Sequence, residues 1–575
     1  MYGFVRLGCA SPKIILGNLT ENRRQINQSL QKAYEKKIQV LLFPKDVLTG
    51  YSLGDMKKQE LILRACEREL REISKLPLLS FIGFPYAYQG RVLSLYGAFY
   101  QGEIIALVTE EVIEDRVVFL GREIPISNEI SFQMEDSKAL IGFSQEAIQL
   151  ISDQKPMSWT SDIENKIQYA YWSRKRILAI TSPGLGESTT DFVYSGHLSI
   201  YKEGELLVEG KDLIFADVDS QSVKSKAACL VLKIPKEEKE EKRLPLFHSG
   251  IKKHPFVPKD EKQLERALKI LSQGLASRLD HIGEDKIYLG LSGGLDSSLA
   301  MLIAIRALKS LNLPLKNLHC LSLPAYGSSL QTKRNILALM AEFPVTFQQL
   351  DMKESLETHL NLLGISKEDH SLAFENAQAR ERTQIIMDLC NKNGGLMIGP
   401  SDLSELALGF TTYNGDHMSM YGINSGVSKT MAQALVAYEA KRLGSKALKD
   451  VLVTPISPEL LPGKDGKIEQ KTEELLGPYE LHDFFLYYFL HYHFEPGKIL
   501  FLASQVFDEY SRQEILSVME IFFRRFFFSQ FKRSALPDGP NVTGISLSPR
   551  CGLSMPSDLS SKLWLERIQK LREEV

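Results

Sequence analysis

The stretch KIYLGLSGGLDSS at residues 286–298 decides the fold of the C-terminal half of the chain. A short strand-forming run ends in two glycines, and the helix-like LAMLIAIRALKSL at 299–311 follows directly. A strand, a glycine turn and a helix in this order form an anion site, because backbone N–H groups of the turn and of the helix N-terminus point at the ligand. Gly293 and Gly294 therefore predict a phosphate site at the carboxyl end of this strand.

Side chains in the same stretch add the chemistry of a nucleotide site. Ser292 and Ser297 offer hydroxyl donors, and Asp296 offers a carboxylate that can hold a metal ion against phosphate oxygens. The sequence lacks the pattern G-x-x-x-x-G-K-[ST], which is typical of loops that bind and transfer a γ-phosphate. The simpler alternative is a glycine turn with a capping aspartate.

Strand-like and helix-like segments alternate around this loop. A helix is predicted at 260–279, and further strands at 318–324, 345–351 and 394–400. This alternation predicts a doubly wound parallel sheet of the α/β class, with its ligands at the carboxyl ends of the strands. A short helix is expected near the end of the chain, at 557–573.

The composition is that of an ordinary globular protein. The 575 residues are 44% apolar and 24% charged, and 69 basic against 71 acidic residues give a net charge of −2. This balance argues against binding nucleic acid through bulk electrostatics. The six cysteines form no C-x-x-C pair, and the most apolar stretch, at 484–490, is too short to span a bilayer. We expect a reduced, cytoplasmic protein with no membrane or nucleic-acid partner.

A charged run, KEEKEEKR at 236–243, marks the clearest boundary. It lies between two prolines and cannot bury itself, so we interpret it as a linker, with an exposed helix as the alternative. The predicted domains are 1–235, a linker at 236–258, and 259–575, which includes a C-terminal extension. The first domain alternates strand-like segments with a helical stretch at 55–75, which predicts a layered α/β sandwich.

The phosphate loop resembles that of the N-type ATP pyrophosphatases (adenine nucleotide alpha hydrolase-like), a class that includes GMP, asparagine and NAD synthetases and tRNA-modifying ligases. Downstream segments narrow this choice, because they resemble motifs of the long, two-domain bacterial NAD synthetases. These segments are ENAQARER at 375–382, DLSELALGFTTYNGDHMSMYGIN at 402–424, VSKT at 427–430 and SQFKRSALPDGP at 529–540. A tRNA-modifying enzyme would need a basic RNA-binding module or reactive cysteines, and the chain offers neither.

The resemblance implies an ATP-dependent ligase that converts deamido-NAD, ATP and ammonia into NAD, AMP and pyrophosphate with the help of Mg²⁺. By resemblance, the catalytic residues are Asp296, Glu405, Lys429 and Lys532, and the first two hold the metal. The residues expected at ATP are Gly290, Ser292, Gly293, Gly294, Asp296, Ser297 and Ser401. Those expected at deamido-NAD are Asn376, Arg380, Glu405, Asp416, Lys532 and Arg533.

One position departs from the family pattern. Where the family often has T-G-D-L-S-E, this chain has PSDLSE at 400–405, so a threonine is replaced by Pro400. A hydrogen bond to ATP is then lost or moved to Ser401. The simpler interpretations are a solvated helix face for Arg380 and a first-turn helix acid for Glu405.

The N-terminal domain resembles the nitrilase-like glutaminase domain of the same enzymes, an α/β/β/α sandwich. The match lies in YGFVRLGCASPKI at 2–14, LLFPKDVLTGYSLGDM at 41–56 and GLGESTTDFVYSGHLSIY at 184–201. The family's catalytic Glu, Lys and Cys fall on Lys45, Glu110 and Ser144. A hydroxyl lacks the acidity that makes a thiolate available near neutral pH. We therefore predict a domain that is inactive as a glutaminase, with an ion pair of reversed polarity between Lys45 and Glu110.

These expectations leave alternatives open. The enzyme could depend on glutamine through a residual activity, such as a Ser144–Lys45 hydrolase, or through glutaminase activity supplied by a partner. It could also be a non-catalytic nucleotide-binding scaffold. We expect a homo-oligomer, because the related two-domain enzymes are multimeric, and a separate ammonia-donating protein as an alternative to ammonia from solution.

Overall fold

The computed structural model describes residues 4–111, 113, 115–134, 137–142, 148–152, 161–173, 177–184, 186–187, 192–219, 251–324, 330–366, 369, 371–455, 472–550 and 552–574. The chain divides into two compact units, one within residues 1–242 and one formed mainly by residues 243–575. Most of the predicted linker at 236–258 lies outside the described residues, so its boundaries stay a prediction.

The N-terminal unit contains two sheets. The first has eight strands in the order β14-β1-β2-β3-β4-β5-β7-β6, and the second has six in the order β13-β12-β11-β10-β9-β8. The first sheet consists of β1 (Phe4–Ala10), β2 (Val40–Leu42), β3 (Leu79–Tyr88), β4 (Arg91–Tyr100), β5 (Glu103–Val108), β6 (Asp115–Phe119), β7 (Arg122–Ser127) and β14 (Leu213–Asp219). The second consists of β8 (Glu129–Met134), β9 (Ser137–Gly142), β10 (Ile148–Ser152), β11 (Ile177–Thr181), β12 (Leu198–Lys202) and β13 (Glu205–Gly210).

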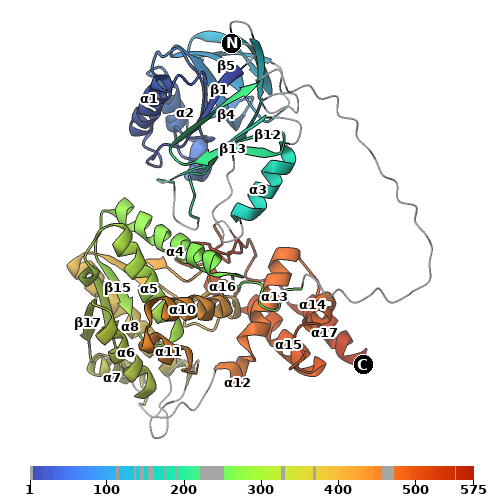
Figure 1. Ribbon diagram of the computed structural model, residues 1–575. Coiled ribbons are helices and arrows are strands. Elements are labelled where there is room, and N and C mark those ends of the chain that lie inside the picture. Colours follow the sequence, from blue (N-terminus) through green and yellow to red (C-terminus); the bar gives the residue numbers. More distant parts are fainter. Residues whose placement is uncertain are drawn as a thin grey trace. The chain divides into compact units, whose positions relative to one another are not determined.

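Alternation along the strands stacks these sheets into four layers. Val40 and Leu42 share one buried core with Ile177 of β11, so these faces lie between the sheets. Leu41 points the opposite way, into a core shared with α1 (Leu19–Glu35) and α2 (Glu60–Leu70). The outer face of β11 packs against α3 (Ser161–Trp172). The predicted nitrilase-like α/β/β/α sandwich is confirmed (Figure 1).

The C-terminal unit is built on a parallel sheet of order β17-β16-β15-β18-β19. Its strands are β15 (Ile287–Gly290), β16 (Leu318–Ser322), β17 (Thr346–Gln349), β18 (Leu396–Gly399) and β19 (Tyr421–Gly422). The chain leaves β15 toward β16 and later returns to the other side of β15 as β18. Because the strand order reverses there, a crevice for ligands is expected at the carboxyl ends of β15 and β18. The predicted doubly wound sheet is confirmed.

Helices pack around this sheet and extend beyond it (Figure 1). They are α4 (Glu261–Ile282), α5 (Leu295–Ser310), η2 (Leu315–Asn317), α6 (Leu330–Glu342), α7 (Lys353–Leu363), α8 (Leu372–Asn393), α9 (Leu403–Leu408), α10 (Lys429–Leu443), α11 (Lys446–Leu452), α12 (Thr472–Leu476), α13 (Tyr479–Tyr492), α14 (Pro496–Ala503), α15 (Arg512–Phe528), α16 (Gln530–Arg533) and α17 (Lys562–Glu573). No helix among the described residues is both long enough and apolar enough to cross a bilayer.

Two predicted helices differ from the structure. The stretch 55–75 is not one helix: the 3₁₀ segment η1 (Tyr51–Lys58) ends at the extended Gln59, and α2 starts after it. Leu61, an apolar residue of this stretch, is 79% exposed. The expected helix at 557–573 begins only at Lys562.

Candidate active site

The phosphate loop lies between β15 and α5, as predicted. Gly293 has a φ of +80°, and a Cβ there would lie 2.4 Å from the carbonyl oxygen of Thr332, so only glycine fits. The N–H of Gly294 donates to the Ser292 hydroxyl at 3.2 Å. Ser297 is only 2% exposed and its Oγ lies 3.0 Å from that of Ser292, so the Ser297 hydroxyl stabilises the loop from inside. Of these serines, Ser292 is the exposed one.

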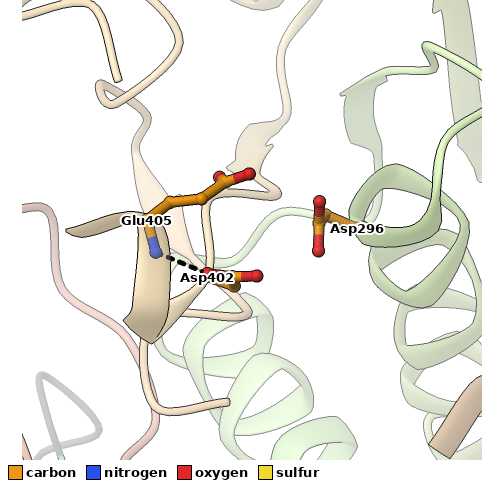
Figure 2. A group of neighbouring side chains, drawn as sticks. All are labelled: Asp296, Asp402 and Glu405. Carbon is orange, nitrogen blue, oxygen red and sulfur yellow. Dashed lines mark hydrogen bonds between the residues drawn. The ribbon is translucent and has the colours of Figure 1, made fainter. Parts of the chain in front are cut away.

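Three carboxylates face one another where the loop meets the segment after β18 (Figure 2). Asp296 comes from the first turn of α5, and Asp402 and Glu405 come from the start of α9; their nearest oxygens lie within 4.8 Å of one another. Asp402 also caps α9, because its Oδ1 accepts from the Glu405 N–H at 2.8 Å. The pattern D-x-x-E at 402–405 is a helix-start signal, so this cap could have been predicted.

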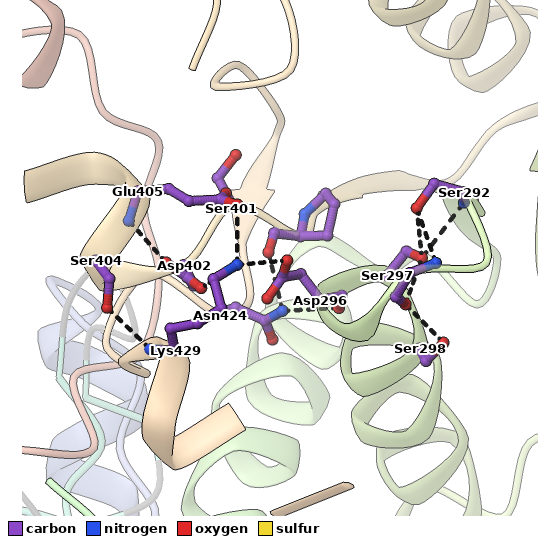
Figure 3. Close-up of polar contacts among 12 residues, drawn as sticks. Ser292, Asp296, Ser297, Ser298, Ser401, Asp402, Ser404, Glu405, Asn424 and Lys429 are labelled. Carbon is purple, nitrogen blue, oxygen red and sulfur yellow. Dashed lines mark hydrogen bonds and ion pairs between the residues drawn. The ribbon is translucent and has the colours of Figure 1, made fainter. Parts of the chain in front are cut away.

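Lys429 lies at the centre of these carboxylates (Figure 3). Its Nζ is 2.7 Å from Asp296 Oδ2, 2.7 Å from Asp402 Oδ2 and 2.9 Å from Glu405 Oε1, and its side chain is completely buried. Burial alone lowers the pKa of Lys429, but the three carboxylates outweigh it and raise that pKa well above the usual range. The cluster therefore holds a permanent ammonium beside the phosphate loop.

Burial disfavours the ionised form of Glu405 and Asp402. Burial raises the pKa of Glu405 to about 7, the charge of Asp296 adds to the rise, and Lys429 opposes it. Burial likewise raises the pKa of Asp402. When all three acids are ionised, one ammonium leaves two negative charges unbalanced, which matches one divalent cation. Asp296 Oδ1 is also buried without a hydrogen-bond partner among the described residues, so the carboxylates fit a hard cation such as Mg²⁺.

Comparisons with known proteins show what the chain is similar to. The sequence profile of the family described as NAD synthase matches residues 267–522. The chain is 30% identical to the glutamine-dependent NAD(+) synthetase of Mycobacterium leprae, an alignment that covers 99% of this chain and 98% of that protein. The chain belongs to the NAD(+) synthetase family. It is 28% identical to the Mycobacterium tuberculosis (strain H37Rv) protein of the same name, over 99% of this chain and 98% of the relative.

Solved structures of the family share the fold. The structure of a glutamine-dependent NAD(+) synthetase from Cytophaga hutchinsonii matches with a TM-score of 0.76 at 16% identity, covering 98% of this chain and all of that one. The Acinetobacter baumannii enzyme in complex with adenosine diphosphate matches with a TM-score of 0.63 at 16% identity, covering 95% and 97%. As a member of this family the chain is a ligase of NAD biosynthesis.

Four of the six residues that the family resemblance assigned to deamido-NAD converge on one loop, residues 409–417. The Asn376 side-chain oxygen accepts from the Thr412 hydroxyl at 2.9 Å, and Arg380 Nε donates to the Tyr413 carbonyl at 3.2 Å. Asp416 accepts from the Thr412 N–H at 2.8 Å. Lys532 Nζ donates to the Gly409 carbonyl at 2.8 Å. These side chains are brought together at the loop, where Arg380 and Lys532 donate to backbone carbonyls and Asn376 accepts from the Thr412 side chain.

Ser401, which follows the Pro400 that replaces the family's threonine, also contacts this loop. Its hydroxyl donates to the main-chain carbonyl of Asp416 at 2.9 Å. Pro400 contributes its carbonyl, which accepts from the Asn424 amide at 2.9 Å. Gly290 ends β15, where a Cβ would lie 2.9 Å from Ile386.

Arg533 does not lie in this site. It is completely buried, and its guanidinium donates to the carbonyls of Leu406, Ala407 and Phe526 and to the Gln530 side chain. Burial lowers the pKa of Arg533. The predicted contact with deamido-NAD is therefore not supported: Arg533 satisfies the free carbonyls at the end of α9.

The N-terminal unit has the expected ion pair of reversed polarity. Lys45 Nζ lies 3.0 Å from Glu110 Oε1, with Lys45 13% and Glu110 54% exposed. The neighbouring Asp46 is completely buried and accepts from Lys57 Nζ at 2.5 Å and from the Ser94 hydroxyl at 2.7 Å. Ser144 lies outside the described residues.

Proposed function

We propose that this member of the NAD(+) synthetase family adenylates deamido-NAD with ATP and amidates the product with ammonia, giving NAD, AMP and pyrophosphate. The observation that carries the proposal is the buried ammonium of Lys429 among Asp296, Asp402 and Glu405, directly beside the phosphate loop. A carboxylate cluster with two excess negative charges suits a magnesium-bound triphosphate, whereas a plain glycine turn needs no such cluster.

In the first step, a nicotinate carboxylate oxygen attacks the α-phosphorus of ATP. The bond from that phosphorus to the oxygen bridging the β-phosphorus breaks, and pyrophosphate leaves with the electron pair. Backbone N–H groups of Gly293 and Gly294 and the Ser292 hydroxyl are suited to hold the departing oxygens. Asp296 and Glu405 would hold Mg²⁺, which neutralises charge on the phosphates when bound, and Lys429 would add a fixed positive charge.

In the second step, ammonia attacks the acyl carbon of the adenylate, and AMP leaves. The nitrogen loses a proton as the amide forms, and a nearby base assists this loss.

We further propose that the N-terminal domain does not release ammonia from glutamine. The Lys45–Glu110 ion pair supports this proposal. By the family resemblance, Lys45 occupies the position of the catalytic glutamate and Glu110 that of the catalytic lysine. The relatives are called glutamine-dependent, which favours glutamine use as the second candidate.

One experiment separates the two. The purified full chain is supplied with deamido-NAD, ATP and Mg²⁺, and NAD formation is compared between ammonium chloride and glutamine. We expect NAD with ammonium chloride and a rate with glutamine at least about tenfold lower. Equal or better rates with glutamine would refute the inactive glutaminase. Loss of that activity in Ser144→Ala would then assign it to this domain.

A further inference from the structure

Helix α13 packs against α9 and α10, which carry Glu405 and Lys429 of the site. Tyr479 and Asp483 are four residues apart and therefore lie on one face of α13. The Tyr479 ring centroid is 5.2 Å from Lys429 Nζ, a cation–π contact. Asp483 is 1% exposed and lies against the start of α9 and α10.

Asp483 accepts hydrogen bonds from Ser404 and Thr430, which are adjacent in sequence to two residues of the site. One of its oxygens accepts from the Ser404 hydroxyl, and the other accepts from the Thr430 N–H at 2.9 Å and the Thr430 hydroxyl at 2.6 Å. Ser404 directly precedes Glu405, and Thr430 directly follows Lys429. Ser404 in turn accepts from the Lys429 N–H at 2.8 Å, so the network closes on itself.

Burying the ionised Asp483 carboxylate costs free energy of folding. Among the described residues no lysine or arginine forms an ion pair with Asp483, and burial raises its pKa. The start of α10 offsets part of this cost, because its N–H groups and dipole favour a negative charge. A buried carboxylate that accepts three hydrogen bonds fixes its donors more rigidly than a neutral group would.

We infer that Asp483 is a positioning residue: it holds Glu405 and Lys429 at the distances the reaction requires, through Ser404 and Thr430. The inference rests on the proposed function. A misplacement of about 1 Å in such a site can lower the rate about 100-fold, although the residue at fault never touches substrate.

The test compares Asp483→Asn and Asp483→Ala with His482→Gln in the full chain. His482 is the matched control, since it is buried on the same helix but faces Phe485, Phe522 and the Leu476 carbonyl. The readouts are thermal unfolding, binding of ATP with Mg²⁺ by calorimetry, and the kcat and KM of ammonia-dependent NAD formation. We expect Asp483→Asn to fold, to bind ATP with Mg²⁺ at least fivefold more weakly and to lower kcat about 10- to 100-fold. His482→Gln should leave binding and kcat within twofold.

Asp483→Ala should exceed Asp483→Asn in every kinetic effect, because it removes all acceptors. Binding and kcat within twofold of the unchanged chain in a folded Asp483→Asn would overturn the inference. Failure of both Asp483 variants to fold would also overturn it and assign Asp483 to stability alone. If the unchanged chain makes no NAD yet Asp483→Asn still weakens nucleotide binding, the proposed function fails while the positioning role stands.

Discussion

The Asn424 side-chain amide donates a hydrogen bond of 2.9 Å to the main-chain carbonyl of Asp296. Its other amide hydrogen reaches the Pro400 carbonyl, also at 2.9 Å, and the whole residue is completely buried. One side chain thereby joins the phosphate loop after β15 to the segment after β18. The separation between Asp296 and Glu405 depends on this connection, because each carboxylate starts from one of the two joined segments.

We expect Asn424→Ala to disturb both stability and catalysis. The Pro400 carbonyl loses its partner, which costs about 1–3 kcal/mol in unfolding free energy, and kcat should fall about 100-fold as the segments separate. Denaturant unfolding and ammonia-dependent NAD formation measure the two effects. Asn22→Ala is the control: Asn22 is equally buried and donates to the Ile15 and Leu48 carbonyls in the N-terminal unit. A similar kcat loss in both variants would contradict a local role for Asn424.

Without the Lys429 ammonium, the three carboxylates around it should repel one another. We expect Lys429→Met to lower the rate of NAD formation about 100- to 1,000-fold and to make thermal stability more dependent on Mg²⁺, because a cation then replaces the lost charge. Unfolding temperatures measured with and without Mg²⁺ report this change. Lys441→Met removes an exposed ion pair with Glu261 and should change neither quantity. No added effect of Mg²⁺ on Lys429→Met would argue against a metal at these carboxylates.

The reversed ion pair of the N-terminal unit should contribute little. Glu110 is half exposed, so solvent and salt screen its attraction to Lys45. A double-mutant cycle with Lys45→Met and Glu110→Gln should give a coupling of about 0–1 kcal/mol, and NAD formation with ammonium chloride should stay within twofold. A loss of tenfold or more in the rate of NAD formation in either variant would contradict this prediction and show that the ion pair contributes to the reaction.

The residues alone predict the parts of the site that are encoded locally, whereas Glu405 and Lys429 were predicted only through the family resemblance. The loop at 292–298 could be predicted because its glycines and the strand and helix around it are contiguous in the sequence. Residues whose roles depend on distant partners were missed: Asp402, Asn424 and Asp483 are ordinary polar residues until the fold brings them to Lys429, Asp296 and Thr430. The helix predicted at 55–75 failed for a similar reason, since its apolar spacing did not reveal the break before α2.

Arg533 and Lys532 belong to one motif but differ in exposure. In FKRS at 531–534 both cations are suited to phosphates, yet only Lys532 remains partly exposed. We expect Arg533→Lys to lower the unfolding free energy by about 2–4 kcal/mol, because an ammonium cannot reach all the acceptors of a guanidinium. The KM for deamido-NAD of the folded variant should stay within twofold. An increase of tenfold or more without loss of stability would restore the predicted substrate contact.

His482 should make the protein sensitive to acid. Burial lowers its pKa to about 4, against about 6.5 in an unfolded chain, and Nε2 lies 2.8 Å from the Leu476 carbonyl. The folded state therefore binds this proton less readily than the unfolded state. The contribution of the neutral ring is fully present above pH 6.5 and declines as the pH falls toward 4, by about 3 kcal/mol in total.

Unfolding free energies measured between pH 7.5 and 4 test this expectation. His482→Gln keeps a donor for the Leu476 carbonyl but has no proton to bind, so its stability should fall less steeply across this range. The difference between the two curves isolates His482, because the carboxylates that titrate in the same range are common to both chains. Parallel curves would mean that the ring is protonated as readily in the fold as outside it, against the burial on which the prediction rests.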